Sequence, residues 1–345
     1  MNITTLGIDL AKNIFQLHGV NQRGKTILQK KISRAKLADF IVQLPACTIY
    51  MEACAGADYW AKKFISFGHE VKLISPQYVK PFVKTNKNDA KDAEAIVEAG
   101  IRPNMRFVEI KTTEQQDIQS THRIRERLMA QRTALVNQIR GLLMERGIFV
   151  QQGVQKLKRE LPKIVESDEL SASMKENVLE LYKELNYLNS KIAFYDEKIE
   201  AIFKQNEACL RLEKMPGIGK LTATMLVAII GNGSTFKNGR HFAAFSGLVP
   251  RQCSSGGKER LLGISKRGDT YLRKLLIHGA RAVLRHVNKK KDKESLWLQT
   301  LAKRAGMNRA AVALANKMAR RAWAMIHYGT EYQRGHVPSF KSICN

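Results

Sequence analysis

A four-heptad apolar repeat constrains this chain more than any other feature of its sequence. Apolar side chains recur between residues 174 and 202 at alternating spacings of four and three residues. The repeat consists of Met174, Val178, Leu181, Leu185, Leu188, Ile192, Tyr195, Ile199 and Ile202. Such spacing predicts one long helix that carries a coiled-coil seam.

A second helix pattern over residues 118–146 precedes this repeat and is interspersed with arginines. Residues 147–168 contain Gly153 and Pro162, which we expect to act as helix breakers and to turn the chain between the two helices. The pattern leaves open whether the two helices pair within one chain, between chains, or both.

Basic residues are concentrated in the last third of the chain. The 345 residues include 58 Lys and Arg against 31 Asp and Glu, a formal net charge of +27. Residues 211–345 hold 26 basic and 6 acidic residues, a net of +20, whereas residues 1–110 hold 16 and 10. An excess this large predicts a polyanionic partner, nucleic acid first of all.

Several classes of protein are disfavoured. The chain has an odd number of cysteines and no Cys-x-x-Cys pair, which favours reduced thiols in a cytosol-like compartment. The first residues lack the basic and apolar regions of a signal peptide. The densest apolar run, Met225 to Ile230, is far shorter than the ~20 residues of a membrane span. We therefore expect a cytoplasmic protein with no membrane partner.

The front of the chain predicts a mixed α/β sheet, because three meandering strands are followed by alternating helices and strands. The expected strands cover residues 4–10, 14–20, 26–31, 48–51 and 71–74, and the expected helices cover residues 34–44 and 57–67.

Four carboxylates interrupt this pattern. Asp9 lies within an apolar strand, Glu52 follows another strand, and Asp89 and Asp92 are three residues apart in a helical segment. Oxygen ligands of this kind suit Mg²⁺, and paired ions of that type assist phosphoryl transfer. The alternative is structural: Asp89 is a helix N-cap with Asp92 in the first turn, and Asp9 is a strand-end turn residue.

The basic third opens with a possible phosphate-binding turn. Pro216-Gly217-Ile218-Gly219-Lys220 precedes an apolar helix over residues 221–230. This arrangement resembles the hairpin of helix-hairpin-helix modules, in which glycines let backbone N–H groups approach a phosphate. A simple connection between two helices is the alternative.

A serine-containing loop follows. Ser254-Ser255-Gly256-Gly257 is flanked by basic residues, which indicates either a plain turn or a serine nucleophile in a phosphate-binding loop. Ser265-Lys266-Arg267-Gly268 then leads into a helix that bears Arg273, and a final helix is expected over residues 309–328.

Taken in order, these motifs resemble the bridge-RNA-guided insertion-sequence transposases of the IS one-ten and IS eleven-eleven groups. The resemblance covers the chain essentially from end to end. The motifs are Gly7-Ile8-Asp9-x-x-Lys12, Met51-Glu52-Ala53, Lys87-x-Asp89-x-x-Asp92-Ala93, Pro216-Gly217-Ile218-Gly219, Gly247-Leu248-Val249-Pro250, Ser254-Ser255-Gly256 and Ile264-Ser265-Lys266-Arg267-Gly268. Each is moderately specific, whereas their order and spacing are highly specific.

The resemblance implies three domains. Residues 1–112 would form an α/β RNase H-like (RuvC-like) catalytic domain. Residues 113–207 would form a helical coiled-coil arm. Residues 208–345 would form a mainly α-helical basic transposase domain that contains the helix-hairpin-helix-like element.

The resemblance also implies the chemistry. Asp9, Glu52, Asp89 and Asp92 map onto the family's Asp-Glu-Asp-Asp catalytic set, which holds Mg²⁺ or Mn²⁺. Ser255 maps onto the nucleophilic serine, with its neighbour Ser254 left open. The residues expected to contact nucleic acid are Gly217, Gly219, Lys220, Lys258, Lys266, Arg267 and Arg273.

The implied function is a DNA transposase that cuts and rejoins donor and target DNA. Its partners would be an element-encoded guide RNA and further copies of itself, as a dimer or tetramer joined through the coiled coil. It would act at the nucleoid of a bacterium or archaeon. Whether the metal-binding and serine-bearing domains of one active site come from different subunits is open.

Three other readings compete with this one. A junction-resolving endonuclease would use the carboxylates and water without Ser255. A sugar-kinase-like or actin-like ATPase also has Gly-Ile-Asp-Leu near its N-terminus, but it needs further glycine-rich phosphate loops. A non-catalytic helix-hairpin-helix DNA-binding protein leaves the carboxylates without a role.

Overall fold

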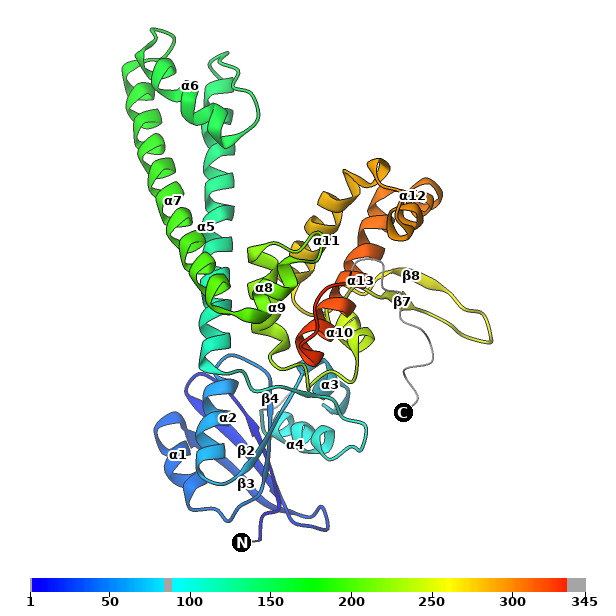
Figure 1. The fold of residues 1–345 in the computed structure, drawn as a ribbon. Helices are drawn as coiled ribbons and strands as arrows, with labels where there is room; N and C mark the ends of the chain where they lie inside the picture. The colour runs from blue at the N-terminus through cyan, green and yellow to red at the C-terminus, as the bar shows by residue number, and fades with distance from the viewer. Residues whose placement is uncertain (1, 84–88, 334–345) are drawn as a thin grey trace. The chain divides into compact units, whose positions relative to one another are not determined.

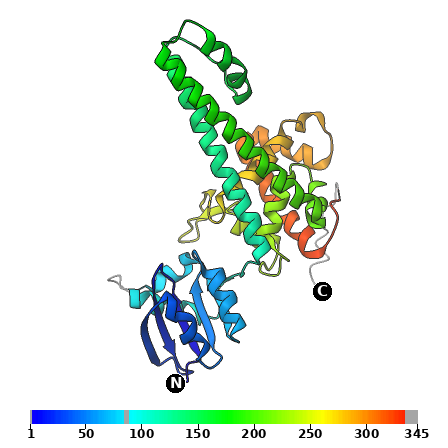
Figure 2. The ribbon, with the colours of Figure 1, turned by 90° about the vertical axis from the view of Figure 1, so that its left-hand side faces the viewer.

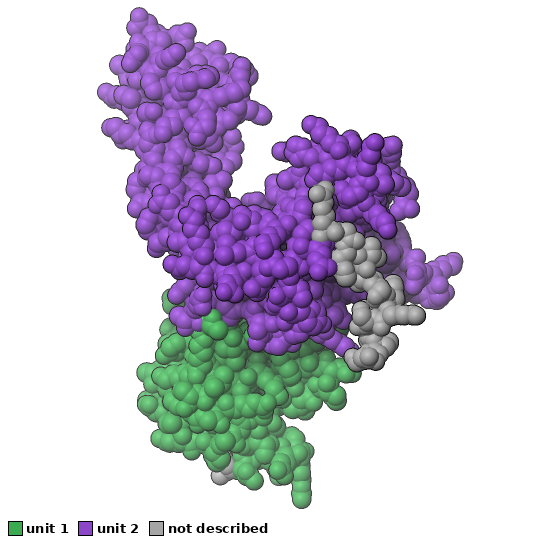
Figure 3. All heavy atoms as spheres, viewed as in Figure 1, with its two compact units in different colours: residues 1–112 green, residues 113–345 purple. Residues whose placement is uncertain are grey.

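The chain forms two compact units, residues 1–112 and residues 113–345 (Figure 3). The computed structural model describes residues 2–83 and 89–333, with only the backbone described for residues 89 and 90. The predicted domain boundary at residue 208 falls inside the second unit and stays a prediction. Within the described residues, no helix combines the length and apolar character that crossing a membrane requires.

The first unit is built on a six-stranded mixed sheet, which confirms the predicted α/β architecture (Figures 1 and 2). In chain order the strands are β1 (Thr5–Asp9), β2 (Ile14–Val20), β3 (Thr26–Ser33), β4 (Thr48–Glu52), β5 (Glu70–Ile74) and β6 (Phe107–Val108). Their order in the sheet is β3-β2-β1-β4-β5-β6. β1, β4 and β5 are parallel to one another, and the remaining pairs are antiparallel. This topology is compatible with an RNase H-like fold.

Helices cover both faces of this sheet. The helical segments are α1 (Arg34–Val42), α2 (Ala57–Ser66), α3 (Pro76–Val79), η1 (Lys80–Phe82) and α4 (Asp89–Gly100). α1 and α2 share a core with Leu6 and Ile8 of β1, whereas α4 shares a second core with Tyr50 of β4. Because successive strand residues point to opposite faces, Gly7 and Asp9 face the α4 side.

The second unit is helical apart from one hairpin. Its elements are α5 (Thr113–Met144), α6 (Val154–Glu166), α7 (Ala172–Gln205), α8 (Glu207–Glu213), α9 (Lys220–Ile230), α10 (Gly239–Phe245), β7 (Pro250–Gln252), β8 (Leu261–Ile264), α11 (Thr270–Leu284), η2 (Val287–Lys289), α12 (Lys293–Ala305) and α13 (Met307–Tyr328). The predicted long helices are confirmed as α5 and α7, and the predicted last helix as α13, which ends at the left-handed Gly329.

α5 and α7 pack side by side within the chain (Figure 1). They run antiparallel. Arg125 of α5 is paired with Asp196 of α7, whereas Arg132, seven residues further along α5, is paired with Asn189, seven residues further back in α7. Leu185 and Ile192 of the predicted seam are buried in this contact. The sequence left open whether the two helices pair within one chain, and the structure shows that they do.

Our expectation that Pro162 acts as a helix breaker is wrong, because Pro162 lies inside the helix α6. Leu157 and Leu161 on the same helix are fully buried against the apolar side chains of α5 and α7. A proline within a helix costs ~3 kcal/mol, and burial of these two leucines offsets that cost.

A separate core holds together the helices after residue 203. Leu226 of α9, Leu276 of α11 and Ala315 of α13 are completely buried in it. The hairpin β7–β8 extends from these helices with nearly all of its residues exposed (Figure 1).

Candidate functional site

Asp9 and Glu52 lie at the carboxyl ends of two neighbouring parallel strands. β1 and β4 pair in register with Ile8 opposite Met51, so the next residue on each strand is the carboxylate. Ile8 and Met51 are fully buried on the α1/α2 side of the sheet. Alternation along the strands therefore turns both carboxylates toward the opposite face, which α4 covers.

Two glycine contacts hold α4 close to this face. A β-carbon added to Gly7 would lie 2.5 Å from the Ala93 carbonyl oxygen, and one added to Gly100 would lie 2.4 Å from the Tyr50 ring. Only glycine allows such close packing. Asp92 precedes Ala93, so the Gly7 contact brings it to the strand ends that carry Asp9 and Glu52.

The pKa of Glu52 responds to the other two carboxylates. Burial raises the pKa of Glu52, and the negative charges of Asp9 and Asp92 raise it further. Carboxylates that repel one another in this way are stabilised by a shared cation. The all-oxygen donor set suits Mg²⁺ or Mn²⁺.

The fourth predicted ligand, Asp89, begins α4, and its side chain lies outside the described residues. Among the side chains that are described, no three possible ligands stand close enough together to hold a metal ion. The structure thus brings Asp9, Glu52 and Asp92 together without showing a closed coordination shell.

Arg34 was not among the predicted site residues, yet it secures the turn that follows Asp9. Its guanidinium donates hydrogen bonds to the carbonyl oxygens of Lys12 (2.7 Å) and Ala11 (3.1 Å). The Arg34 backbone N–H also donates to the Asn13 carbonyl oxygen at 2.8 Å. A single arginine at a helix start carries no sequence signal for this role.

Ser255 lies at the tip of the exposed hairpin. The backbone N–H of Lys258 donates to the Ser255 carbonyl oxygen at 3.1 Å. The two residues between them, Gly256 and Gly257, have φ values of 56° and 75°. Positive φ at both central positions is what a type I′ hairpin turn requires, and this explains the glycine pair.

The two candidate serines differ in their contacts. The hydroxyl of Ser254 accepts hydrogen bonds from the Gln252 side chain at 3.0 Å and from the Arg260 backbone N–H at 3.3 Å. Among the described residues, Ser255 is bonded only through its backbone. Its hydroxyl is therefore exposed and available to a ligand, whereas that of Ser254 supports the hairpin.

The predicted nucleic-acid residues of the hairpin region divide into two groups. Lys258, Lys266 and Arg267 are exposed. Arg273 of α11 is only 8% exposed and donates hydrogen bonds to nearby carbonyl oxygens. This placement favours a supporting role for Arg273, and a direct contact with nucleic acid stays a prediction.

The predicted phosphate-binding turn joins α8 to α9. Gly217 has a φ of 89°, and a β-carbon there would lie 2.8 Å from the Gly279 carbonyl oxygen of α11. Gly219 is the N-cap of α9 and has open space around it. The Lys220 ammonium is paired with Glu200 at 2.8 Å. Gly217 is thus needed for close packing and Gly219 faces open space, and a helix-hairpin-helix role for this turn stays a prediction.

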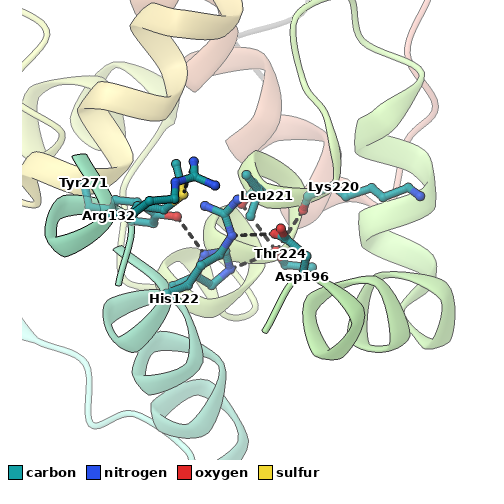
Figure 4. A network of polar contacts seen from close by, with 9 residues as sticks. His122, Arg132, Asp196, Lys220, Leu221, Thr224 and Tyr271 are labelled. Atoms are coloured by element: carbon teal, nitrogen blue, oxygen red, sulfur yellow. Dashed lines mark hydrogen bonds and ion pairs between the residues drawn. The ribbon is translucent and has the colours of Figure 1, made fainter. Parts of the chain in front are cut away.

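A buried polar network links α5 to α9 and α11 (Figure 4). Thr224 donates its hydroxyl hydrogen to the Lys220 carbonyl oxygen at 2.8 Å, so it accepts the hydrogen bond from His122 Nε2–H at 3.0 Å. His122 Nδ1 then accepts from the Tyr271 hydroxyl at 3.1 Å. Burial, followed by the charge of Arg125, lowers the pKa of His122 to about 4. The imidazole is therefore neutral at pH 7.

The chain is similar to known transposases over most of its length. A family model described as "Transposase" matches residues 6–147, and one described as "Transposase IS116/IS110/IS902 family" matches residues 209–295. The chain is 49% identical to the transposase for insertion sequence element IS1111A of Coxiella burnetii, over 97% of this chain and 92% of that protein. It is 48% identical to a probable family 20 transposase of Pseudomonas aeruginosa, over 97% of this chain and 100% of that protein. It is 41% identical to the transposase for insertion sequence element IS1328 of Yersinia enterocolitica, over 96% of this chain and 99% of that protein.

Proposed function

The chain belongs to the IS110/IS116/IS902 family of transposases, enzymes that cut and rejoin DNA, and we propose that it does so through Ser255 with help from a divalent metal. The observation that carries this proposal is the free, exposed hydroxyl of Ser255 at the tip of a basic hairpin. The resemblance of the Ser254-Ser255-Gly256 motif to the family's nucleophile points to the same residue.

The reaction proceeds by two transfers at phosphorus. The Ser255 oxygen attacks a DNA phosphodiester, and its proton passes to a base or to water. The bond from phosphorus to the 3′ oxygen breaks, which leaves a 3′ hydroxyl and a phosphoserine linked to the 5′ end. A 3′ hydroxyl from the exchanged strand then attacks the phosphoserine, restores the phosphodiester and releases the serine.

The carboxylates Asp9, Glu52 and Asp92, together with Asp89, would hold Mg²⁺ or Mn²⁺. When bound, such an ion would supply Lewis-acid stabilisation of negative charge during phosphoryl transfer. Support comes from the position of Asp9 and Glu52 at adjacent strand ends and from the pKa of Glu52, which burial raises and the charges of Asp9 and Asp92 raise further. Asp89 is included in this set because it matches the family's fourth carboxylate.

Trapping the covalent adduct tests the serine. Wild-type protein incubated with Mg²⁺ and DNA that carries the element end should give a protein–DNA adduct, and Ser255→Ala should give none. Ser254→Ala is the matched control, and we expect it to form the adduct. An adduct with Ser255→Ala would contradict the assignment. Cleavage without an adduct in either protein would favour a nuclease that uses water.

We also propose that the basic surface of residues 211–345 binds a guide RNA in addition to DNA. A net charge of +20 on these residues exceeds the roughly 6–10 phosphate contacts of a typical DNA-binding protein, which leaves cations for a second nucleic acid. RNA recovered with the purified protein would be sequenced, and changes in its loops should redirect integration. Recovery of RNA unrelated to the element would contradict guidance. Such an enzyme would remain with the nucleoid in the cytoplasm.

An oligomer joined through α7 is the last part of the proposal. Tyr187 and Phe194 are seven residues apart and 58% and 47% exposed, so they share a side of the helix that does not face α5. Lys191 and Lys198 lie over the two rings. Sedimentation of wild type and of Phe194→Asp should give an oligomer and a monomer, respectively. Identical masses would contradict the role of α7.

A further inference from the structure

Arg273 is an arginine buried inside a strongly basic unit. It lies in the first turn of α11 and is 8% exposed. Its guanidinium donates hydrogen bonds to the carbonyl oxygens of Arg267 (2.8 Å) and Ser246 (3.3 Å) and to the Thr270 hydroxyl (3.2 Å). Burial of a cation is costly unless its donors are satisfied, so these three bonds are what keeps Arg273 inside.

The two carbonyl groups belong to the two ends of the serine hairpin. Ser246 precedes β7 and Arg267 follows β8. Backbone hydrogen bonds already join these ends: Ser265 N–H donates to Val249 at 2.8 Å, and Lys266 N–H donates to Gly247 at 3.2 Å. Arg273 adds a third link, which fastens both ends of the hairpin to α11.

The backbone at this junction is closely packed and strained. A β-carbon on Gly247 would lie 2.2 Å from the Arg267 carbonyl oxygen, and one on Gly268 would lie 1.9 Å from that of Phe245. Lys266 has a φ of 55° and is the one residue other than glycine with positive φ in the described part of the chain. This conformation costs ~1–2 kcal/mol and persists only where neighbouring contacts enforce it.

The hairpin itself is exposed along its length. Every residue from Pro250 to Gly263 is exposed, and an isolated two-stranded hairpin is at best marginally stable in water. The position of its tip therefore depends on how its two ends are held.

We propose that Arg273 is a positioning residue for Ser255. It acts through the Ser246 and Arg267 carbonyl groups, holding the ends of the hairpin so that the tip is presented in one orientation. This inference rests on the proposed role of Ser255 as the nucleophile. It assigns Arg273 a supporting role in place of a phosphate contact.

The test compares Arg273→Lys with wild type in the full-length protein. A lysine keeps the charge but lacks the planar fork that reaches two carbonyl groups. We expect hydrogen exchange of the Ser265 and Lys266 amides to accelerate. We also expect the rate of adduct formation at saturating DNA to fall ~10–100-fold, since a displacement of about 1 Å costs that much. The DNA concentration for half-maximal rate should change less than twofold.

Two variants serve as controls. Arg159→Lys lies on α6, outside the basic surface of residues 211–345, is exposed and pairs with Glu160 at 3.7 Å, so it should behave as wild type. Arg273→Met keeps much of the side-chain volume but removes the buried charge and the hydrogen bonds to the Ser246 and Arg267 carbonyl groups. A folded Arg273→Met protein that loses adduct rate at unchanged DNA affinity supports positioning, because loss of folding is then excluded.

The outcomes separate the two proposals. If the adduct depends on Ser255 and both Arg273 variants keep the wild-type rate, the positioning role is wrong and the nucleophile stands. If Ser255→Ala still forms the adduct, the proposed function fails regardless of amide exchange. Loss of DNA affinity in Arg273→Lys, with unchanged exchange at Ser265, would instead mark Arg273 as a phosphate contact and overturn the inference.

Discussion

Gly7 of β1 and Val97 of α4 are in such close contact that a β-carbon added to Gly7 would lie 2.6 Å from a Val97 methyl group. The same contact places the N-terminal part of α4, with Asp92, beside the carboxyl ends of β1 and β4. The position of Asp92 thus depends on Gly7, which lies two residues before Asp9, another carboxylate of the candidate site.

Gly7→Ala should therefore destabilise the first unit and displace Asp92. Overpacking of a filled interior costs ~1–3 kcal/mol, which urea unfolding will measure. DNA cleavage should fall by more than the loss of folded protein explains. The control is Gly141→Ala in α5, where a β-carbon meets nothing within 4 Å, and which should stabilise by up to ~1 kcal/mol. Equal stability of Gly7→Ala and wild type would contradict the packing argument.

Asp92→Asn tests the carboxylate cluster without relying on activity. Burial raises the pKa of Glu52, and the charges of Asp9 and Asp92 raise it further. Removing the charge of Asp92 relieves part of this repulsion, so the metal-free variant should melt at a higher temperature than wild type. Mn²⁺ should raise the melting temperature of the wild-type protein, and it should raise that of Asp92→Asn much less. Mg²⁺-dependent cleavage should fall ~100-fold or more, and chelator should abolish it in wild type.

Asp39→Asn is the matched control for this experiment, because Asp39 is exposed on α1, on the other face of the sheet. It should leave both the melting temperature and its response to Mn²⁺ unchanged. A shift by Mn²⁺ of the same size in Asp92→Asn and wild type would exclude Asp92 as a ligand.

The sheet was predictable because its strands are short apolar runs bounded by turn residues. Asp9 and Glu52 stood out as carboxylates at strand positions, but their proximity depends on the Ile8–Met51 register, which a single sequence does not reveal. Gly7 could have been noticed as a glycine inside a strand, a sign of close backbone approach.

The basic third was less predictable. Arg273 was grouped with the surface cations, since a basic residue in a basic region gives no sign that it is buried. The hairpin around Ser255 was expected as a loop, because its strands, Pro250–Gln252 and Leu261–Ile264, are too short to show alternation. Pro162 was misjudged because the burial of its helical neighbours outweighed its local preference.

The second unit should lose stability as the pH falls, through His122. The pKa of His122 is lowered to about 4 from an ordinary value of 6.5, so the unfolded chain binds the proton more readily than the folded chain. Stability is complete above pH 6.5 and declines toward pH 4, with a loss of ~2 kcal/mol at pH 5. Urea unfolding of wild type and His122→Gln at pH 7.5 and pH 5 measures this.

The comparison with His122→Gln removes the contributions of other titrating groups. The variant should be less stable at pH 7.5, because Gln does not reproduce both bonds to Thr224 and Tyr271. Its further loss at pH 5 should be ~2 kcal/mol smaller than that of wild type. Parallel losses in the two proteins would show that His122 is not the group responsible.

The salt dependence of DNA binding tests the surface of the hairpin. Lys258 is exposed at its tip, beside Ser255, and a phosphate contact there releases one counterion. Lys258→Ala should reduce the slope of log affinity against log salt concentration by ~0.9, uniformly across DNA sequences. Lys183→Ala is the control, because Lys183 is an exposed lysine of α7 paired with Glu180, and it should leave the slope unchanged. A slope that is unchanged in Lys258→Ala would place the DNA backbone away from the tip of the hairpin.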